Sequence, residues 1–160
     1  NDSALKTNFV TDWNNDLIYG HTNGTIVKWD PAADSTATFA FETKDIDFGF
    51  PAVRKKIYRA RVSYKGNGTG VTVQYRVNGD NNTVNPFYRT QADGSTDNSN
   101  SDTTPLLDVG TDDWVLAELK PVTTATANNV YSFQLTFGGT PAADFEINDI
   151  SIVYRAKSIK

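Results

Sequence analysis

The fold class is decided by residues 142–154, which read Ala142-Ala-Asp-Phe-Glu-Ile-Asn-Asp-Ile-Ser-Ile-Val-Tyr154. Apolar and polar residues alternate here, but the alternation shifts once by a single residue. The apolar positions are Phe145, Ile147, Ile150, Ile152 and Tyr154. Successive strand side chains point to opposite faces, so the backbone must absorb the extra residue for all five to share one face. We therefore predict a long β-strand with a bulge or tight bend at Asn148 and Asp149.

Three other segments alternate apolar and polar residues without interruption. Their apolar positions are Tyr58, Ala60, Val62 and Tyr64, then Val71, Val73, Tyr75 and Val77, then Tyr131, Phe133, Leu135 and Phe137. A period of two predicts strands with one buried and one solvated face, and the Gly-rich residues 65–70 predict a hairpin turn. Shorter strand candidates are residues 17–20, 25–30, 38–43 and 114–120.

The frequent turns and the lack of a helical apolar period predict an all-β fold. Roughly seven to nine strands with this pattern are typical of an antiparallel β-sandwich of jelly-roll or immunoglobulin-like type. We place this sandwich over residues 31–160. The polar residues 92–105 are predicted to form a long surface loop.

The first thirty residues are predicted to form a separate N-terminal arm. Residues 16–30 resemble a β-hairpin with the turn His21-Thr-Asn-Gly24, similar to the inner strands of a β-propeller blade. A lone hairpin cannot bury its faces, so it must pack on the sandwich or on a missing neighbour. Because the chain begins with Asn1 instead of Met, we also expect it to be cut from a larger protein.

Composition excludes several classes of function. The chain has 160 residues, a formal net charge of −4 and no cysteine. A nucleic-acid module would need a basic stripe, and no apolar run is long enough to span a membrane. Without cysteine the chain has no thiol catalysis and no thiolate metal site.

Several blocks together resemble a known family. They are residues 43–65, 117–121, 128–135 and 145–155, and the similarity extends over residues 16–160, weakest through residues 92–105. Their order and spacing are similar to a domain in structural proteins of tailed bacteriophages, especially marine ones, where it closes a longer polypeptide that contains a propeller. The resemblance implies a tail-associated virion component, located in the particle and forming homo-oligomers and contacts with other virion subunits. It implies no catalytic residues.

Carbohydrate binding is the alternative function. Sugar-binding sandwiches present aromatic rings on an exposed sheet face, whereas the outward positions of the clear strands here are polar. The outward polar side chains include Arg59, Arg61, Arg76 and Gln134, which would either form solvated strand faces or contact a neighbouring subunit. Three further aromatics, Phe87, Tyr88 and Trp13, are expected in loops, where they would form a small rim pocket for a cell-surface glycan unless Trp13 anchors the N-terminal arm.

No residue pattern predicts an enzyme. His21 is the only histidine and falls in a predicted turn, where neither a catalytic triad nor a histidine metal site is favoured. The carboxylate pairs are Asp45 with Asp47, and Glu146 with Asp149. A glycosidase needs two carboxylates across a bound sugar, and solvated strand faces or ion pairs with nearby basic residues explain these pairs better.

Calcium is the one cofactor that the sequence raises. Asp93, Asp97 and Asp102 recur in the predicted polar loop, and Ca²⁺ favours carboxylate and other oxygen ligands. Their spacing matches no EF-hand loop. We name these three as candidate calcium ligands and expect no other cofactor.

Overall fold

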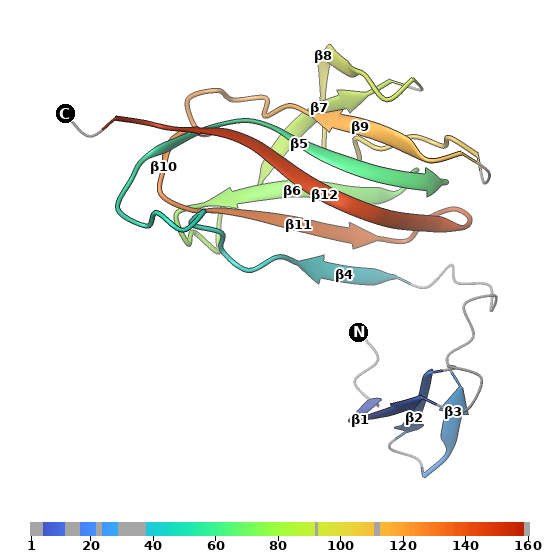
Figure 1. Cartoon of the computed structure of the whole chain (residues 1–160). Helices are drawn as coiled ribbons and strands as arrows, with labels where there is room; N and C mark the ends of the chain where they lie inside the picture. Colours follow the sequence, from blue (N-terminus) through green and yellow to red (C-terminus); the bar gives the residue numbers. More distant parts are fainter. Residues whose placement is uncertain are drawn as a thin grey trace. The chain divides into compact units, whose positions relative to one another are not determined.

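A computed structural model describes residues 5–11, 17–21, 24–28, 38–91, 93–110 and 113–158. The chain divides into two compact units, Asn1–Ser35 and Thr36–Lys160. Every regular element in the described residues is a β-strand, and all pairings between strands are antiparallel (Figure 1). The all-β prediction is therefore confirmed.

The first unit contains a three-stranded sheet in the order β1-β2-β3. Its strands are β1 (Leu5–Thr11), β2 (Leu17–His21) and β3 (Ile26–Lys28). The predicted hairpin is present, because β2 pairs with β3 from Ile18 opposite Lys28 to Gly20 opposite Ile26. Strand β1 was not predicted, and it adds a third strand to this hairpin.

The second unit is built from the remaining strands. They are β4 (Phe39–Glu42), β5 (Lys55–Gly66), β6 (Val71–Val77), β7 (Asn85–Thr90), β8 (Thr96–Asp102), β9 (Val115–Leu119), β10 (Asn128–Val130), β11 (Phe133–Gly139) and β12 (Phe145–Ala156). One sheet has the order β4-β11-β6-β7-β8. In the other, β12 pairs along the length of β5, so β9 and β10 share the opposite edge of β5.

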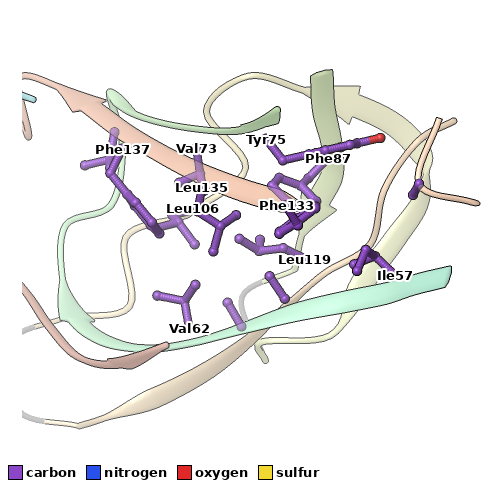
Figure 2. Close-up of a cluster of buried hydrophobic side chains, with 14 of the residues drawn as sticks. Ile57, Val62, Val73, Tyr75, Phe87, Leu106, Leu119, Phe133, Leu135 and Phe137 are labelled. Atoms are coloured by element: carbon purple, nitrogen blue, oxygen red, sulfur yellow. The ribbon is translucent and has the colours of Figure 1, made fainter. Parts of the chain in front are cut away.

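The two sheets of this unit form a sandwich-like arrangement with the core between them (Figures 1 and 2). Each sheet contributes alternate apolar residues, as the period of two predicted. The fully or almost fully buried side chains include Ile57, Ala60, Val62, Tyr64, Val71, Val73, Tyr75, Phe87, Leu119, Phe133, Leu135 and Phe137. The buried phases predicted for β6 and β11 are confirmed at these positions.

The predicted bulge in β12 is also confirmed. Ile147 pairs with Tyr64 and Asp149 pairs with Ser63, which leaves Asn148 as the extra residue. The ladder absorbs this residue, so Ile147, Ile150 and Ile152 pack on the same core.

A second irregularity in the same strand pair was not predicted. Val153 pairs with Arg59 and Tyr154 pairs with Ile57, so Tyr58 is the extra residue on β5. As a result Ile57 is buried, whereas Tyr58 and Tyr154 are exposed, contrary to the predicted phase. Tyr131 is exposed for a different reason: it lies between the end of β10 and the start of β11.

The loop prediction for residues 92–105 was wrong, because this segment contains β8. Thr90 pairs with Thr96, and Phe87 pairs with Asp102. Ladder hydrogen bonds join backbone groups, so an edge strand can form from polar residues that carry no apolar alternation. Strand β7 was missed too, and Phe87, expected in a loop, is a fully buried core residue.

Tyr75 gives a testable pH dependence for the core. Its ring packs between those of Phe87 and Phe133, at centroid distances of 5.0 and 5.3 Å, and its buried hydroxyl has no hydrogen-bond partner among the described residues. Burial raises the pKa of Tyr75 from 10.0 to about 12. The folded state thus holds this proton more tightly than the unfolded chain does, and the stabilisation present below pH 10 is lost as pH rises through 12.

We expect the Tyr75→Phe variant to lose this part of the alkaline destabilisation, which amounts to about 3 kcal/mol. Denaturant unfolding measured from neutral pH to the alkaline limit should show a shallower decline for Tyr75→Phe than for the wild type. Tyr58→Phe, at an exposed ring, serves as the control. Equal declines for wild type and Tyr75→Phe would show that Tyr75 is not the group responsible.

Candidate functional site: the arginine face

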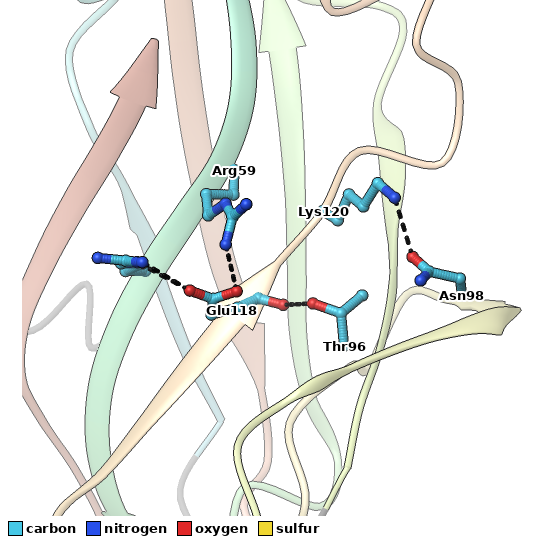
Figure 3. Close-up of polar contacts among 6 residues, drawn as sticks. Arg59, Thr96, Asn98, Glu118 and Lys120 are labelled. Atoms are coloured by element: carbon cyan, nitrogen blue, oxygen red, sulfur yellow. Dashed lines mark hydrogen bonds and ion pairs between the residues drawn. The ribbon is translucent and has the colours of Figure 1, made fainter.

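The outer side of the β12-β5-β9 sheet carries a charged cluster centred on Glu118 (Figure 3). Arg61 of β5 lies directly opposite Glu118 of β9, and its Nε and Nη2 donate to Oε1 at 3.0 and 2.7 Å. Arg59 Nη1 donates to the other carboxylate oxygen, Oε2. We call Arg59, Arg61, Trp114, Leu116 and Glu118 the arginine face. These three charged side chains are partly exposed, so the ion pairs contribute little stability but leave further guanidinium N–H donors for a ligand.

The apolar part of this face comes from Leu116 of β9 and from Trp114, which directly precedes β9. Ala117 and Leu119 point into the core, so Trp114 and Leu116 lie on the outer side with 47% and 50% of their surface exposed. Lys65 Nζ lies 5.2 Å from the Trp114 ring centroid and 3.2 Å from Glu146 Oε1. Exposed tryptophan and arginine on one sheet face are a composition that protein–protein interfaces favour.

Residues of strand β8 line one side of a hollow next to this face. An open hollow of about 320 Å³ is lined by Tyr58, Arg59, Thr96, Asn98, Glu118 and Lys120. Thr96 Oγ1 donates to the backbone carbonyl of Glu118 at 2.5 Å, and Lys120 Nζ donates to Asn98 Oδ1 at 3.1 Å (Figure 3). The hollow therefore combines cations, a carboxylate, an amide and a tyrosine ring.

The chemistry of the hollow suits binding better than hydrolysis. Glu118 is the one carboxylate among its lining residues, and Arg59 and Arg61 both pair with it. Acid–base cleavage of a glycoside needs a second carboxylate across the substrate. Hydroxyl and carboxylate groups of a ligand would instead find hydrogen-bond partners here.

The structure divides the four predicted polar contacts between two faces. Arg59 and Arg61 lie together on the arginine face. Arg76 and Gln134 lie directly opposite each other on the other sheet, where Arg76 Nη1 is 2.9 Å from Glu42 Oε1. Gln134 Nε2 donates to the carbonyl of a loop residue at 2.8 Å.

The three predicted aromatic contacts also separate. Phe87 is buried in the core and is not accessible to a ligand at the surface. Tyr88 is half-buried in β7, and its ring centroid lies 5.9 Å from Lys120 Nζ, next to the hollow. Trp13 and the side chain of His21 lie outside the described residues.

Three of the four paired carboxylates have local partners. Asp45 Oδ2 accepts a hydrogen bond from Ser132 Oγ at 2.7 Å, and Asp47 Oδ1 accepts one from the Gly49 amide at 2.8 Å. Glu146 pairs with Lys65, and Asp149 is exposed beside the β12 bulge.

The candidate calcium ligands each accept a hydrogen bond from the backbone amide two positions later. For Asp93, Asp97 and Asp102 the donors are Ser95, Ser99 and Thr104. Hydrogen bonds from the side chains and amides of Ser95 and Ser99 lower the pKa of Asp93 and of Asp97, respectively. Within the described ranges, no group of three or more His, Asp or Glu side chains is arranged to hold a metal ion.

No family model, curated protein or solved structure matches the chain. In the part of the chain that the structure describes, no helix is long and apolar enough to cross a membrane.

Proposed function

We propose that the chain is a structural component of a bacteriophage virion, tail-associated, and that it acts through subunit–subunit contacts at the arginine face. Its second unit would be a sandwich of jelly-roll or immunoglobulin-like type. The resemblance of residues 43–65, 117–121, 128–135 and 145–155 to phage structural proteins supports this proposal.

The observation that carries the proposal is the composition of the arginine face. Trp114 and Leu116 offer apolar surface beside two guanidinium groups that Glu118 holds in place. A partner that covers this face would bury the indole ring as an anchor and accept the remaining guanidinium hydrogen bonds. Such a contact needs no catalytic group.

The small sheet of the first unit provides a second apolar surface. Val10 pairs with Ile18, and Ile26 pairs with Gly20. Ile18 and Gly20 are two residues apart on β2, so Val10, Ile18 and Ile26 lie on the same face of the sheet. Val10 and Ile26 are 65% and 81% exposed. A sheet of this size with an exposed apolar face gains stability from a neighbouring subunit.

The tail role is tested on purified phage particles. We expect peptides of the chain in virions by mass spectrometry and its density in a particle reconstruction. A phage encoding Trp114→Ala with Leu116→Ala should lose the chain from its particles, whereas the control Val84→Ala, also at an exposed apolar residue, should retain it. Absence of the wild-type chain from virions would refute the proposal, and normal incorporation of the double variant would exclude the arginine face.

Receptor recognition through a glycan is the second candidate function, and the hollow between β5, β8 and β9 favours it. A glycan array with and without calcium should then show binding that Glu118→Gln combined with Asn98→Ala removes. Replacing Asp93 and Asp97 with alanine tests separately whether glycan binding depends on these candidate calcium ligands. An array without any binder would reject this function.

A further inference from the structure

The start of β5 and the end of β12 form a basic end of the second unit. Lys55 pairs with Ala156, and Lys56 lies directly opposite Arg155, so like charges face each other across the strands. The basic residues gathered here are Arg54, Lys55, Lys56, Arg155 and Lys157. We call Arg54, Lys56, Arg155 and Lys157 the basic end, because Lys55 is buried.

These cations differ in their partners from five other basic side chains of the unit. Among the described residues, no carboxylate forms an ion pair with any of them. Ion pairs to carboxylates are made instead by Arg59, Arg61, Lys65, Arg76 and Arg89. The basic end therefore carries positive charge that the described part of the chain does not neutralise.

Neutral groups hold two side chains of the basic end in place. Arg54 Nε donates to the Tyr131 hydroxyl at 3.0 Å, with the guanidinium carbon 5.4 Å from the ring centroid. Lys157 Nζ donates to Asn129 Oδ1. An open hollow of about 330 Å³ is lined by these two cations, by their partners Tyr131 and Asn129, and by Ala52 and Ser158. An anionic group entering this hollow would meet two oriented cations.

The opposite end of the same two strands is acidic. Strand β5 ends at Gly66, where β12 begins with Phe145. The exposed carboxylates around this point are Asp108, Asp113, Asp144 and Glu146, which we call the acidic end. A hollow of about 140 Å³ is lined by Lys65, Gly66, Asp144 and Glu146. Glu146 pairs with Lys65, the one cation in that lining, and Asp144 adds a further negative charge.

We propose that copies of the chain associate head to tail, with the basic end of one copy docked on the acidic end of the next. The inference rests on the proposed role in subunit contacts and names its partner, a second copy of this chain. The charges that complement the basic end are those of the acidic end of the same chain. The two ends are roughly 36 Å apart, which is the length of a strand such as β5. A contact between two different surfaces repeats from copy to copy and gives a closed ring or an open filament.

The contact should depend strongly on salt. Both ends are exposed, and charges in solution are screened over about 8 Å at physiological ionic strength. Self-association is therefore expected at low ionic strength and should weaken progressively as salt is added.

The test uses charge reversal in the full chain, with sedimentation velocity at low ionic strength as the readout. Arg54→Glu with Lys157→Glu cancels the net positive charge of the basic end, and Asp113→Lys with Asp144→Lys cancels the net negative charge of the acidic end. Each variant alone should self-associate about tenfold more weakly than the wild type. An equimolar mixture should regain association, because the unchanged acidic end of the first variant can bind the unchanged basic end of the second.

A control variant carries the same change in net charge as Arg54→Glu with Lys157→Glu, at one residue of β7 and one that follows β9. Arg89→Glu with Lys120→Glu should associate like the wild type, and thermal unfolding confirms that all variants are folded. The proposal is overturned if the wild type is monomeric, if the reversed variants associate normally, or if their mixture stays dissociated. A monomeric wild type that binds an acidic polysaccharide through Arg54 and Lys157 would overturn it in favour of a ligand site.

The outcome is separable from that of the tail role. A chain that associates head to tail in solution but is absent from virions would retain this contact and refute the tail role. A chain that is found in virions but stays monomeric in isolation would support the tail role and refute the head-to-tail contact.

Discussion

Replacing Gly66 with alanine is expected to destabilise the protein by about 3 to 5 kcal/mol, from a steric clash together with backbone strain. A Cβ atom built on Gly66 would lie 1.9 Å from the carbonyl oxygen of Asp144, and Gly66 has a φ of +83°. The colliding atom belongs to the backbone, so no side-chain rotation can relieve the contact.

Gly66 has little freedom to move away, because three segments meet at it. Its amide donates to the Gly110 carbonyl at 2.6 Å, and its carbonyl accepts a hydrogen bond from the Val109 amide at 3.1 Å. It also pairs with Phe145 at the start of β12. A shift of this residue would therefore break the junction between β5, β12 and the segment before β9.

The matched control for this prediction is Gly49→Ala. Gly49 has a similar φ of +76°, but a Cβ there would meet no atom within 4 Å. We expect this control to cost about 1 kcal/mol, from the positive φ alone. Denaturant unfolding of the two variants separates clash from strain, and equal losses of stability would contradict the close approach at Gly66.

Replacing Lys55 with alanine is expected to destabilise the protein by about 3 to 5 kcal/mol, because two carbonyls lose their donor and the side-chain volume is left empty. Lys55 is fully buried, and its Nζ donates to the carbonyls of Phe50 and Tyr131 at 2.5 and 2.8 Å. It also lies 5.8 Å from the Phe48 ring centroid. This side chain ties the loop before β5 to the turn before β11.

Two further variants resolve the origin of the effect at Lys55. Lys55→Met keeps most of the side-chain volume and removes the hydrogen bonds, so its free energy of unfolding should lie between those of the wild type and Lys55→Ala. Lys56→Ala, at a less buried lysine whose Nζ lies 5.0 Å from the Tyr58 ring centroid, should cost less than about 1 kcal/mol. A Lys55→Met variant as stable as the wild type would show that these hydrogen bonds contribute no net stability.

The candidate site could be predicted only in part. Arg59 and Arg61 were expected to point outward, and they do, since strand alternation fixes the face of each side chain. Their common partner Glu118 was not identified, because 57 residues separate it from Arg61 and only the pairing of β5 with β9 brings them together. No local pattern around Glu118 distinguishes it from any other outward carboxylate.

The missed strands have the same kind of cause. β7 buries Phe87 alone among large apolar residues, and β8 reads Thr-Asp-Asn-Ser-Asn-Ser-Asp, without an apolar position. Their strand character comes from the backbone ladder that begins at β6, and not from their own side chains. Consequently the β8 residues that line the hollow could not be predicted either.

The sequence by itself determined the all-β class, the inward faces of β6 and β11, and the bulge at Asn148 in β12. Each of these depends on the polarity of neighbouring residues, which a period of two converts directly into a buried or an exposed face. Only the tertiary structure decided the Tyr58 bulge, the partner of Arg61 and the opposite charges at the two ends of β5. These depend on which strands pair and in which register, and that is set by contacts between residues far apart in the chain.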